Sequence, residues 1–226
     1  MPELVSVVLA VRDGERYIAE AIASVLAQAH RPIELLVVDG GSTDRTAEIV
    51  AGIPEARLLR QPGAGIPDAW NHGIRSARGG FVAFISHDDR WTPDKLAVQL
   101  ELMRRRPDLL YTVGRVRFFV EPGERPAPGF RPELLEGAHV GRIMETLVAR
   151  REAFATIGLL SGNPLAHDVD WYARAKDLGA PMAVVDEVIL EKRVHGANSA
   201  ADPNLTGPDL LDVLRLSIER QRGEEP

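Results

Sequence analysis

Acidic side chains stand at the ends of several apolar runs in the N-terminal part of this 226-residue chain. Asp13 follows the first run, Asp39 closes the second, and Asp88 and Asp89 follow a later one. Carboxylate oxygens bind hard cations such as Mg²⁺, and they also accept hydrogen bonds from a ribose or a nucleobase. If the runs are neighbouring parallel strands, their carboxyl ends meet at one sheet edge, where α/β proteins bind ligands. We therefore expect these carboxylates to converge on one crevice.

Each acidic segment also has a purely structural explanation. Residues 39–44 fit a turn that leads into a helix N-cap, because Gly permits the turn and Ser or Asp accepts from free helix amides. Asp88 and Asp89 fit another capped turn. Asp168 and Asp170 stand at the start of a predicted helix, where negative charge is favourable without any catalysis. A single motif therefore does not distinguish a site from a turn, and the order of several motifs must decide.

A parallel sheet is needed to bring the carboxylates together, and the N-terminal pattern predicts one. Short β-rich apolar runs alternate with helical patterns, as in repeated βαβ units. The predicted strands are 4–11, 34–39, 56–60 and 81–86, and the predicted helices are 15–29, 44–51 and 67–77. The expected fold class is therefore α/β, a single Rossmann-like domain with a mostly parallel central sheet flanked by helices.

The rest of the chain predicts further elements around this core. Thr92 is a candidate N-cap for a helix that ends near Arg105. Later elements are a strand at 109–120, a loop at 121–131, an apolar stretch at 143–148, helices at 150–157 and 167–178, and strands at 182–185 and 188–194. An amphipathic pattern at 208–222 predicts a last helix that covers the core or a partner. We expect one domain at 1–207, with the helix and tail of 208–226 packed on it.

Composition and charge exclude several classes of function. The chain is 45% hydrophobic and 27% charged, has a formal net charge of -6 and contains no Cys. The lack of Cys excludes disulfides, thiolate metal sites and a Cys nucleophile. No segment gathers basic and aromatic residues as a nucleic-acid surface does, and no stretch of about 20 apolar residues would span a bilayer. The cytoplasm is the expected compartment, with peripheral attachment to the inner face of the membrane as the alternative.

Several motifs occur in the same order as in glycosyltransferase family 2, which the chain resembles over residues 4–196. The matching segments are Val5–Leu9 with Ala21–Gln28, Val37–Asp44, Gly65–Ile74 with Ala77–Gly80, Ile85–Asp89, His167–Arg174 and Lys192–Asn198. An ordered set of this kind is far more specific than any single motif. The resemblance implies the GT-A fold and an inverting transfer of a sugar from a nucleotide-diphosphate sugar to an acceptor hydroxyl, assisted by Mn²⁺ or Mg²⁺.

The resemblance also implies roles for individual residues. Asp168 would be the general base that takes the proton of the acceptor hydroxyl, and Asp39 would contact the nucleobase. Asp88 would bind the metal and the diphosphate, with Asp89 or His195 as additional metal ligands. The expected donor contacts are Ala10, Val11, Asp13, Asp39, Gly41, Ser42, Asp68, Asn71, Ser86, His87, Asp88 and His195.

Three positions depart from the family pattern and keep other functions open. Asp13 replaces a common Asn, Ser86 replaces the first Asp of the metal motif, and His167 replaces the usual Glu before the base. A nucleotide-sugar-binding protein without catalysis is therefore the alternative. A zinc hydrolase could use His87, His167 and His195, but no metal-hydrolase spacing supports it. A dehydrogenase and a P-loop kinase are excluded because their glycine motifs are absent.

The substrates are less specified than the reaction. We rank UDP-sugars first among the donors, before GDP- and dTDP-sugars, and we expect a glycan, a lipid-linked sugar or a small molecule as the acceptor. Acceptor choice is expected to lie in residues 121–142 and in the C-terminal helix. The apolar face of that helix could also pair two subunits into a homodimer.

Overall fold

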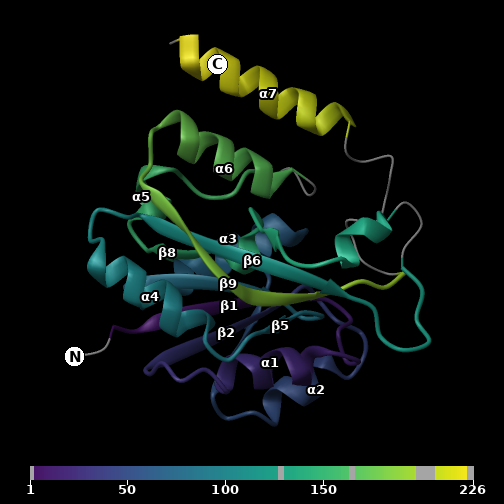
Figure 1. Cartoon of the computed structure of the whole chain (residues 1–226). Helices are drawn as coiled ribbons and strands as arrows, with labels where there is room; N and C mark the ends of the chain where they lie inside the picture. The colour runs from purple at the N-terminus through teal and green to yellow at the C-terminus, as the bar shows by residue number, and fades with distance from the viewer. Residues whose placement is uncertain (1–2, 127–129, 163–165, 197–206, 223–226) are drawn as a thin grey trace.

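A mixed β-sheet with helices on both faces organises the chain (Figure 1). The computed structural model describes residues 3–126, 130–162, 166–196 and 207–222. The strands are β1 Val5–Val11, β2 Ile33–Asp39, β3 Ala56–Arg60, β4 Phe81–Ser86, β5 Arg90–Trp91, β6 Tyr111–Phe119, β7 His139–Val140, β8 Val148–Arg150 and β9 Met182–Arg193. They form one sheet in the order β3-β2-β1-β4-β8-β6-β9-β5, and β7 pairs with β6.

The N-terminal half of this sheet is parallel, as predicted. Strand β1 lies between β2 and β4, β3 lies beyond β2, and all of these pairs are parallel. The second half is mixed, because β8 runs antiparallel to β4 and β6, whereas β9 runs parallel to β6 and antiparallel to β5. The register places Val11 opposite Asp39 and Ala10 opposite Ser86, so β1, β2 and β4 end at one edge.

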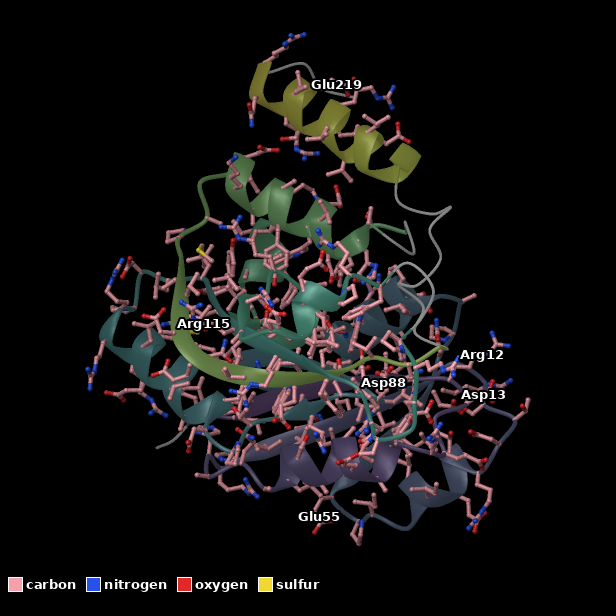
Figure 2. The ribbon with its side chains drawn as sticks, turned by 45° about the vertical axis from the view of Figure 1, so that its right-hand side comes forward. Arg12, Asp13, Glu55, Asp88, Arg115 and Glu219 are labelled. Carbon is pink, nitrogen blue, oxygen red and sulfur yellow. The ribbon has the colours of Figure 1, made fainter. Side chains whose placement is uncertain are left out.

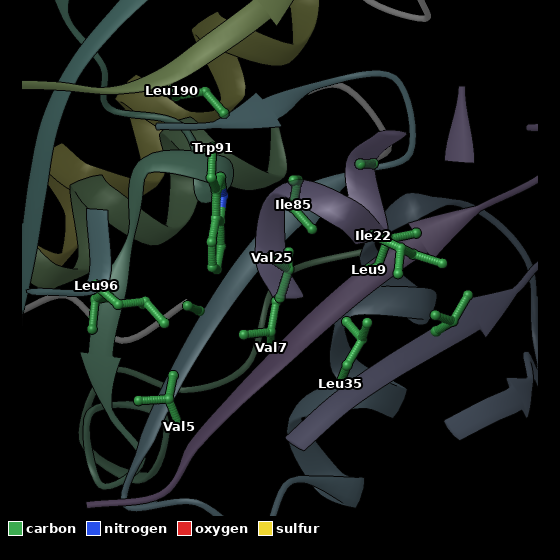
Figure 3. Packing of buried hydrophobic residues seen from close by; sticks show 14 of the residues in the cluster. Val5, Val7, Leu9, Ile22, Val25, Leu35, Ile85, Trp91, Leu96 and Leu190 are labelled. Carbon is green, nitrogen blue, oxygen red and sulfur yellow. The ribbon is translucent and has the colours of Figure 1, made fainter. Parts of the chain in front are cut away.

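Helices cover both faces because the central strands are apolar on both sides. The helices are α1 Ile18–Leu26, α2 Thr46–Ala51, α3 Ile66–Ser76, α4 Lys95–Arg105, α5 Ala153–Thr156, α6 His167–Asp177 and α7 Gly207–Arg222, with 3₁₀ turns η1 Pro132–Leu135 and η2 Met144–Thr146. Val7 and Leu9 of β1 belong to one buried cluster with residues of α1 and α4 (Figure 3). Val8 points to the other face, where it clusters with α3 and α6. No helix in the described ranges is long and apolar enough to cross a membrane.

Long-range contacts move some element boundaries away from the prediction. The prediction that Thr92 caps a helix is wrong, because α4 begins at Lys95. The Thr92 hydroxyl instead donates to the carbonyl of Val188 at 2.9 Å, which ties the start of α4 to β9. The strands predicted at 182–185 and 188–194 form the single strand β9. Long-range contacts that involve β9 therefore explain both differences, the start of α4 and the single strand. Such contacts cannot be predicted from a local sequence pattern.

Helix α7 packs on α6, on the side of α6 that faces away from the sheet (Figure 1). Asp177 at the end of α6 accepts hydrogen bonds from Ser217, Arg220 and Gln221 at 2.9 to 3.0 Å. Val213 of α7 is buried, whereas three other apolar side chains of this helix are exposed: Leu211, Leu214 and Ile218. The division of the chain at residue 207 and the pairing of two subunits stay predictions.

Asp177→Ala is expected to loosen α7 without unfolding the rest of the protein. The change removes three hydrogen bonds of about 0.5–1 kcal/mol each, so amide exchange in residues 211–222 should become roughly 10–100-fold faster. Hydrogen exchange followed by mass spectrometry would measure this. Asp108→Ala, at an exposed carboxylate before β6, is the control. Unchanged exchange in α7 would show that the Asp177 contacts do not hold the helix.

Candidate active site

The loops that follow β1 and β2 are hydrogen-bonded to each other. Asp13 accepts from the N–H of Thr43 at 2.7 Å, and its own N–H donates to the hydroxyl of Ser42 at 2.9 Å. Asp39 accepts from the N–H of Ser42 at 3.0 Å. Asp13 adopts a φ of 50°, a conformation that is uncommon for residues other than Gly. The structure thus brings Asp13, Asp39 and Ser42 together at the expected edge of the sheet.

Gly14 lets His87 approach the loop after β1 closely. A Cβ atom at position 14 would lie 2.7 Å from Cδ2 of His87 and 2.5 Å from Cγ2 of Val11. The N–H of Gly14 donates to the hydroxyl of Thr46 at 2.8 Å, so this loop is also tied to α2. Burial lowers the pKa of His87, and its imidazole is therefore neutral near pH 7.

A cavity of about 570 Å³ opens beside Asp39, between the ends of β2 and β3. Its lining residues are Asp39, Gly41, Ser42, Leu58, Leu59 and Arg60. Gly41 has a φ of 83° and no atom within 4 Å of a Cβ built on it, so the left-handed backbone, not crowding, favours Gly there. The volume lies in the range of small-molecule sites, and polar and apolar groups line it as a nucleoside would require.

Asp68 and Asn71 of α3 are engaged in internal contacts. Asp68 accepts from the side-chain amide of Gln61 at 3.1 Å and from the N–H of Gly63 at 3.0 Å. Asn71 is buried, and its amide donates to the carbonyl of Leu160 at 2.9 Å and accepts from the Leu160 N–H at 3.0 Å. These contacts account for both residue types without a ligand. Contact of either residue with a donor stays a prediction.

A group of buried and half-buried polar residues lies at the end of β4, and we call it the strand-end cluster: Ser86, Asp88, Asp89, Glu145, Lys192 and His195. Asp88 lies 3.1 Å from Nε2 of His195. Asp89 accepts from Nζ of Lys192 at 2.9 Å and from the N–H of Arg193 at 3.0 Å. Figure 2 shows Asp88 and Asp13 toward the same side of the molecule, away from Glu219 of α7. The predicted residues Ser86, Asp88, Asp89 and His195 are therefore neighbours in space.

Glu145 and Lys192 are the members of the cluster to which the prediction gave no role of their own. Oε1 of Glu145 accepts from the hydroxyl of Ser86 at 2.8 Å and from Nζ of Lys192 at 3.0 Å. Lys192 belongs to a basic segment that the sequence did single out, of which Ala197 and Asn198 lie outside the described residues. Glu145 stands in an apolar stretch with no motif around it, so no sequence signal could have found it.

Three acidic groups of the cluster lie around one ammonium group, that of Lys192. Burial alone would raise the pKa of Asp88, but the hydrogen bond from His195 and the charge of Lys192 hold it well below its usual value. Burial raises the pKa of Asp89, opposed by Lys192 and reinforced by the charge of Asp88. Burial would lower the pKa of Lys192, but Asp89, Glu145 and Asp88 together hold it above its usual value. A charged Lys192 therefore keeps the carboxylates together.

Arg193 fixes the backbone on which the cluster is built. Its side chain is 2% exposed, and its Nε donates to the carbonyl of Asp88 at 2.9 Å. The guanidinium pairs with Glu20 and Glu121 and lies 4.4 Å from the ring centre of Tyr17. The main chain at Asp88 is thus held by a residue from the end of β9. Nothing in the sequence singled out Arg193 for this contact.

The candidate base Asp168 is joined to the same cluster through η2. Its Oδ2 accepts from the N–H of Met144 at 3.3 Å, and Met144 directly precedes Glu145. Its Oδ1 is buried, lies 2.9 Å from Nε2 of His167, and makes no hydrogen bond to any residue that the structure describes. An ionised carboxylate is an acceptor and can take up a proton. One short turn therefore contacts both Asp168 and the end of β4.

The protein side chains offer part of a metal site. Among the described residues, no three His, Cys, Asp or Glu side chains form a group that could hold a metal ion by themselves. Asp88 still supplies a carboxylate, and Ser86 beside it supplies a hydroxyl oxygen. Magnesium sites of phosphate-transferring enzymes typically use one or two carboxylates and complete the shell with water and substrate phosphates. The residues present therefore fit a divalent cation that arrives with a diphosphate.

Comparison with known sequences identifies related proteins. The sequence model of the family described as Glycosyl transferase family 2 matches residues 6–158. An uncharacterized glycosyltransferase of Rickettsia typhi is 29% identical over 215 residues, which are 87% of this chain and 65% of that protein. TuaG of Bacillus subtilis, named as a putative teichuronic acid biosynthesis glycosyltransferase, is 35% identical over 108 residues, 46% of this chain and 43% of its own length. The chain covers 65% of the first relative and 43% of the second.

The same fold occurs in TarS of S. aureus. A crystal structure of TarS residues 1–349 in complex with UDP-GlcNAc has a TM-score of 0.72 at 19% identity, covering 96% of this chain and 66% of that one. The same TarS fragment in complex with UDP has a TM-score of 0.71. At this identity the likeness concerns the fold alone. It confirms the expected GT-A fold, with a sheet that is mixed in its second half.

Proposed function

Because this chain belongs to glycosyl transferase family 2, we propose that it moves a sugar from a nucleotide-diphosphate sugar to an acceptor hydroxyl with inversion at the anomeric carbon. One observation carries this proposal: η2 contacts Asp168 through Met144 and the strand-end cluster through Glu145. A base and a charged diphosphate site thus flank one turn. A direct displacement needs both, a base for the nucleophile and stabilisation of the leaving group.

The proposed reaction is a single displacement. The Asp168 carboxylate accepts the proton of the acceptor hydroxyl while that oxygen forms a bond to the anomeric carbon. The bond from this carbon to the diphosphate oxygen breaks, and its electron pair leaves with the nucleoside diphosphate. His167, whose Nε2 lies 2.9 Å from Oδ1, orients the carboxylate. Attack from the side opposite the leaving group inverts the anomeric configuration.

Asp88 is the residue that would hold Mn²⁺ or Mg²⁺ together with the diphosphate. When bound, such an ion neutralises charge on the leaving diphosphate. Lys192 adds a fixed positive charge at the same strand end. Asp89 and His195 stay candidates for further ligands. Asp89 accepts a hydrogen bond from Lys192, and His195 is hydrogen-bonded to Asp88.

The cavity beside Asp39 is the proposed site of the nucleobase and ribose. Asp39 and Ser42 line it, and a carboxylate at a strand end can accept from a base N–H or a ribose hydroxyl. TarS, which shares the fold, was crystallised with UDP and with UDP-GlcNAc. A UDP-sugar is therefore our first candidate donor, followed by GDP- and dTDP-sugars. We propose a glycan, a lipid-linked sugar or a small molecule as the acceptor.

Calorimetric titration with UDP-, GDP- and dTDP-sugars tests this function directly. We expect one class of donor to bind, and we expect chelation of Mn²⁺ and Mg²⁺ to weaken its binding at least about tenfold, since Asp88 would hold the ion together with the diphosphate. Absence of binding by every donor would contradict the proposal. Binding that is equally tight with metal and with chelator would contradict only the role given to the metal.

The second candidate function is a protein that binds a nucleotide sugar without transferring it. Ser86 and His167, which depart from the family pattern, favour this alternative. Donor binding does not separate the two functions, because both require it. Release of the nucleoside diphosphate from the donor, as transfer or as slow hydrolysis, occurs only in the enzyme and can be followed in a coupled assay.

A further inference from the structure

Glu145 places a buried carboxylate beside Ser86, the last residue of β4. Position 86 is Ser, and its hydroxyl donates to Oε1 of Glu145 at 2.8 Å. The Glu145 side chain is 12% exposed, and it reaches this point from η2, 59 residues later in the chain. A carboxylate is therefore present next to position 86, although it comes from a different element.

Lys192 shows what the Glu145 charge does. Nζ of Lys192 lies 3.0 Å from Oε1 of Glu145 and 2.9 Å from Oδ2 of Asp89, so the ammonium sits between two carboxylates. The Lys192 side chain keeps 22% of its surface exposed, whereas Asp89 is completely buried. Without Glu145, Lys192 would keep only the Asp89 partner. Glu145 therefore fixes the ammonium group between two carboxylates, where it would otherwise be paired with Asp89 alone.

The same contact fixes the direction in which the Ser86 hydroxyl donates its proton. A hydroxyl has one proton to donate and two lone pairs to accept with. The proton of Ser86 is directed at Glu145, so the lone pairs of Oγ remain for a ligand. Ser86 can then accept from a sugar hydroxyl or contact a cation, and it does not donate to a phosphate.

We infer that Glu145 is a positioning residue that supplies, from η2, the carboxylate that position 86 lacks, and that it orients Ser86 and Lys192 for the donor. This inference rests on the proposed function, because it assigns the two oriented side chains to the donor site. Met144, the preceding residue, contacts Asp168, so η2 sets the strand end and the candidate base relative to each other.

Moving the carboxylate back to position 86 tests the inference. Calorimetry with UDP, GDP and dTDP in the presence of Mn²⁺ is performed on the wild type, Ser86→Asp, Glu145→Gln and the double variant. Ser86→Asp alone sets two carboxylates against each other, and Glu145→Gln alone removes one of the two charges that position Lys192, so each should weaken nucleotide binding about tenfold or more. The double variant restores one carboxylate and should bind more tightly than either single variant. Glu101→Gln, on the exposed face of α4, is the matched control and should bind as the wild type does.

The outcomes separate this inference from the proposed function. If the loss of nucleotide affinity in the double variant equals the product of the two single losses, the inference is overturned. Wild-type affinity in Glu145→Gln also overturns it. If Glu145→Gln does not fold, the comparison of Ser86→Asp with the double variant still decides, and a double variant that does not fold also overturns it. Melting temperatures of the same four proteins measure the coupling between positions 86 and 145 without a ligand. If the double variant recovers its melting temperature but the wild type binds no nucleotide, the proposed function is rejected. The contact between Ser86 and Glu145 is then still supported.

Discussion

Asp168→Asn should lower kcat by about 10²–10⁴-fold, the usual contribution of a positioned general base, while donor affinity stays close to that of the wild type. The substitution keeps the volume of the side chain and its hydrogen bond from the N–H of Met144. It removes the oxygen that takes the proton of the acceptor. Because the donor is held elsewhere, at the strand-end cluster and beside Asp39, binding and catalysis should separate in this variant.

The measurement is initial-rate kinetics of nucleoside diphosphate release, with donor binding by calorimetry on the same preparations. Asp170→Asn is the informative comparison, because Asp170 lies in the same first turn of α6 and pairs with Arg174 at 3.0 Å. It should lower the melting temperature and spare the turnover of the folded protein. If Asp168→Asn instead lowered stability and left turnover intact, Asp168 would serve the helix dipole and would not be the base.

Asp88→Asn should weaken metal-dependent donor binding by about 100-fold or more, since loss of a partner behind a metal ligand already costs about 10–100-fold. The change keeps the shape of the side chain but removes its charge. His195 and Lys192 would then face an amide, and the diphosphate would lose the carboxylate that shares its cation. Residual binding should become insensitive to Mn²⁺, because the remaining contacts do not require the ion.

Titration of the donor with Mn²⁺, with Mg²⁺ and with chelator would show this loss. Asp108→Asn is the control, because Asp108 is exposed and lies far from the candidate site. It precedes β6, whose first residues pair with β8 level with the start of β4, opposite the strand ends that carry the site. Donor binding by Asp88→Asn that still responded fully to Mn²⁺ would remove Asp88 from the metal site. Melting curves would show whether the loss of affinity reflects unfolding.

The first half of the fold and the acidic edge could be predicted from the sequence, because the signals are local. Each of β1, β2 and β4 is a continuous apolar run followed by polar residues, and each is separated from the next by a helical pattern. Parallel strands end at a shared edge, so the placement of Asp13, Asp39 and Asp88 follows from the order of the elements. The structure confirms this convergence through the register that sets Val11 opposite Asp39.

The second half of the site could not be predicted, because its contacts join distant parts of the chain. Glu145 meets Ser86 across 59 residues and Lys192 across 47 residues. A glutamate between apolar residues has no local signal of burial, since its partners become neighbours only when β8, β6 and β9 join the sheet. The same reason explains Thr92, whose hydroxyl finds Val188 and so does not cap a helix.

The interlocked loops after β1 and β2 have a kinetic consequence. Asp13 is bonded to Thr43 and Gly14 to Thr46, so segments about thirty residues apart are fixed to each other by the protein's own groups. Ordering one residue costs about 1–2 kcal/mol of conformational entropy, and folding has already ordered these loops. The donor therefore binds beside loops that are already ordered. Its capture should be governed by diffusion and by the field of the charged groups, with little waiting for this part of the protein to rearrange.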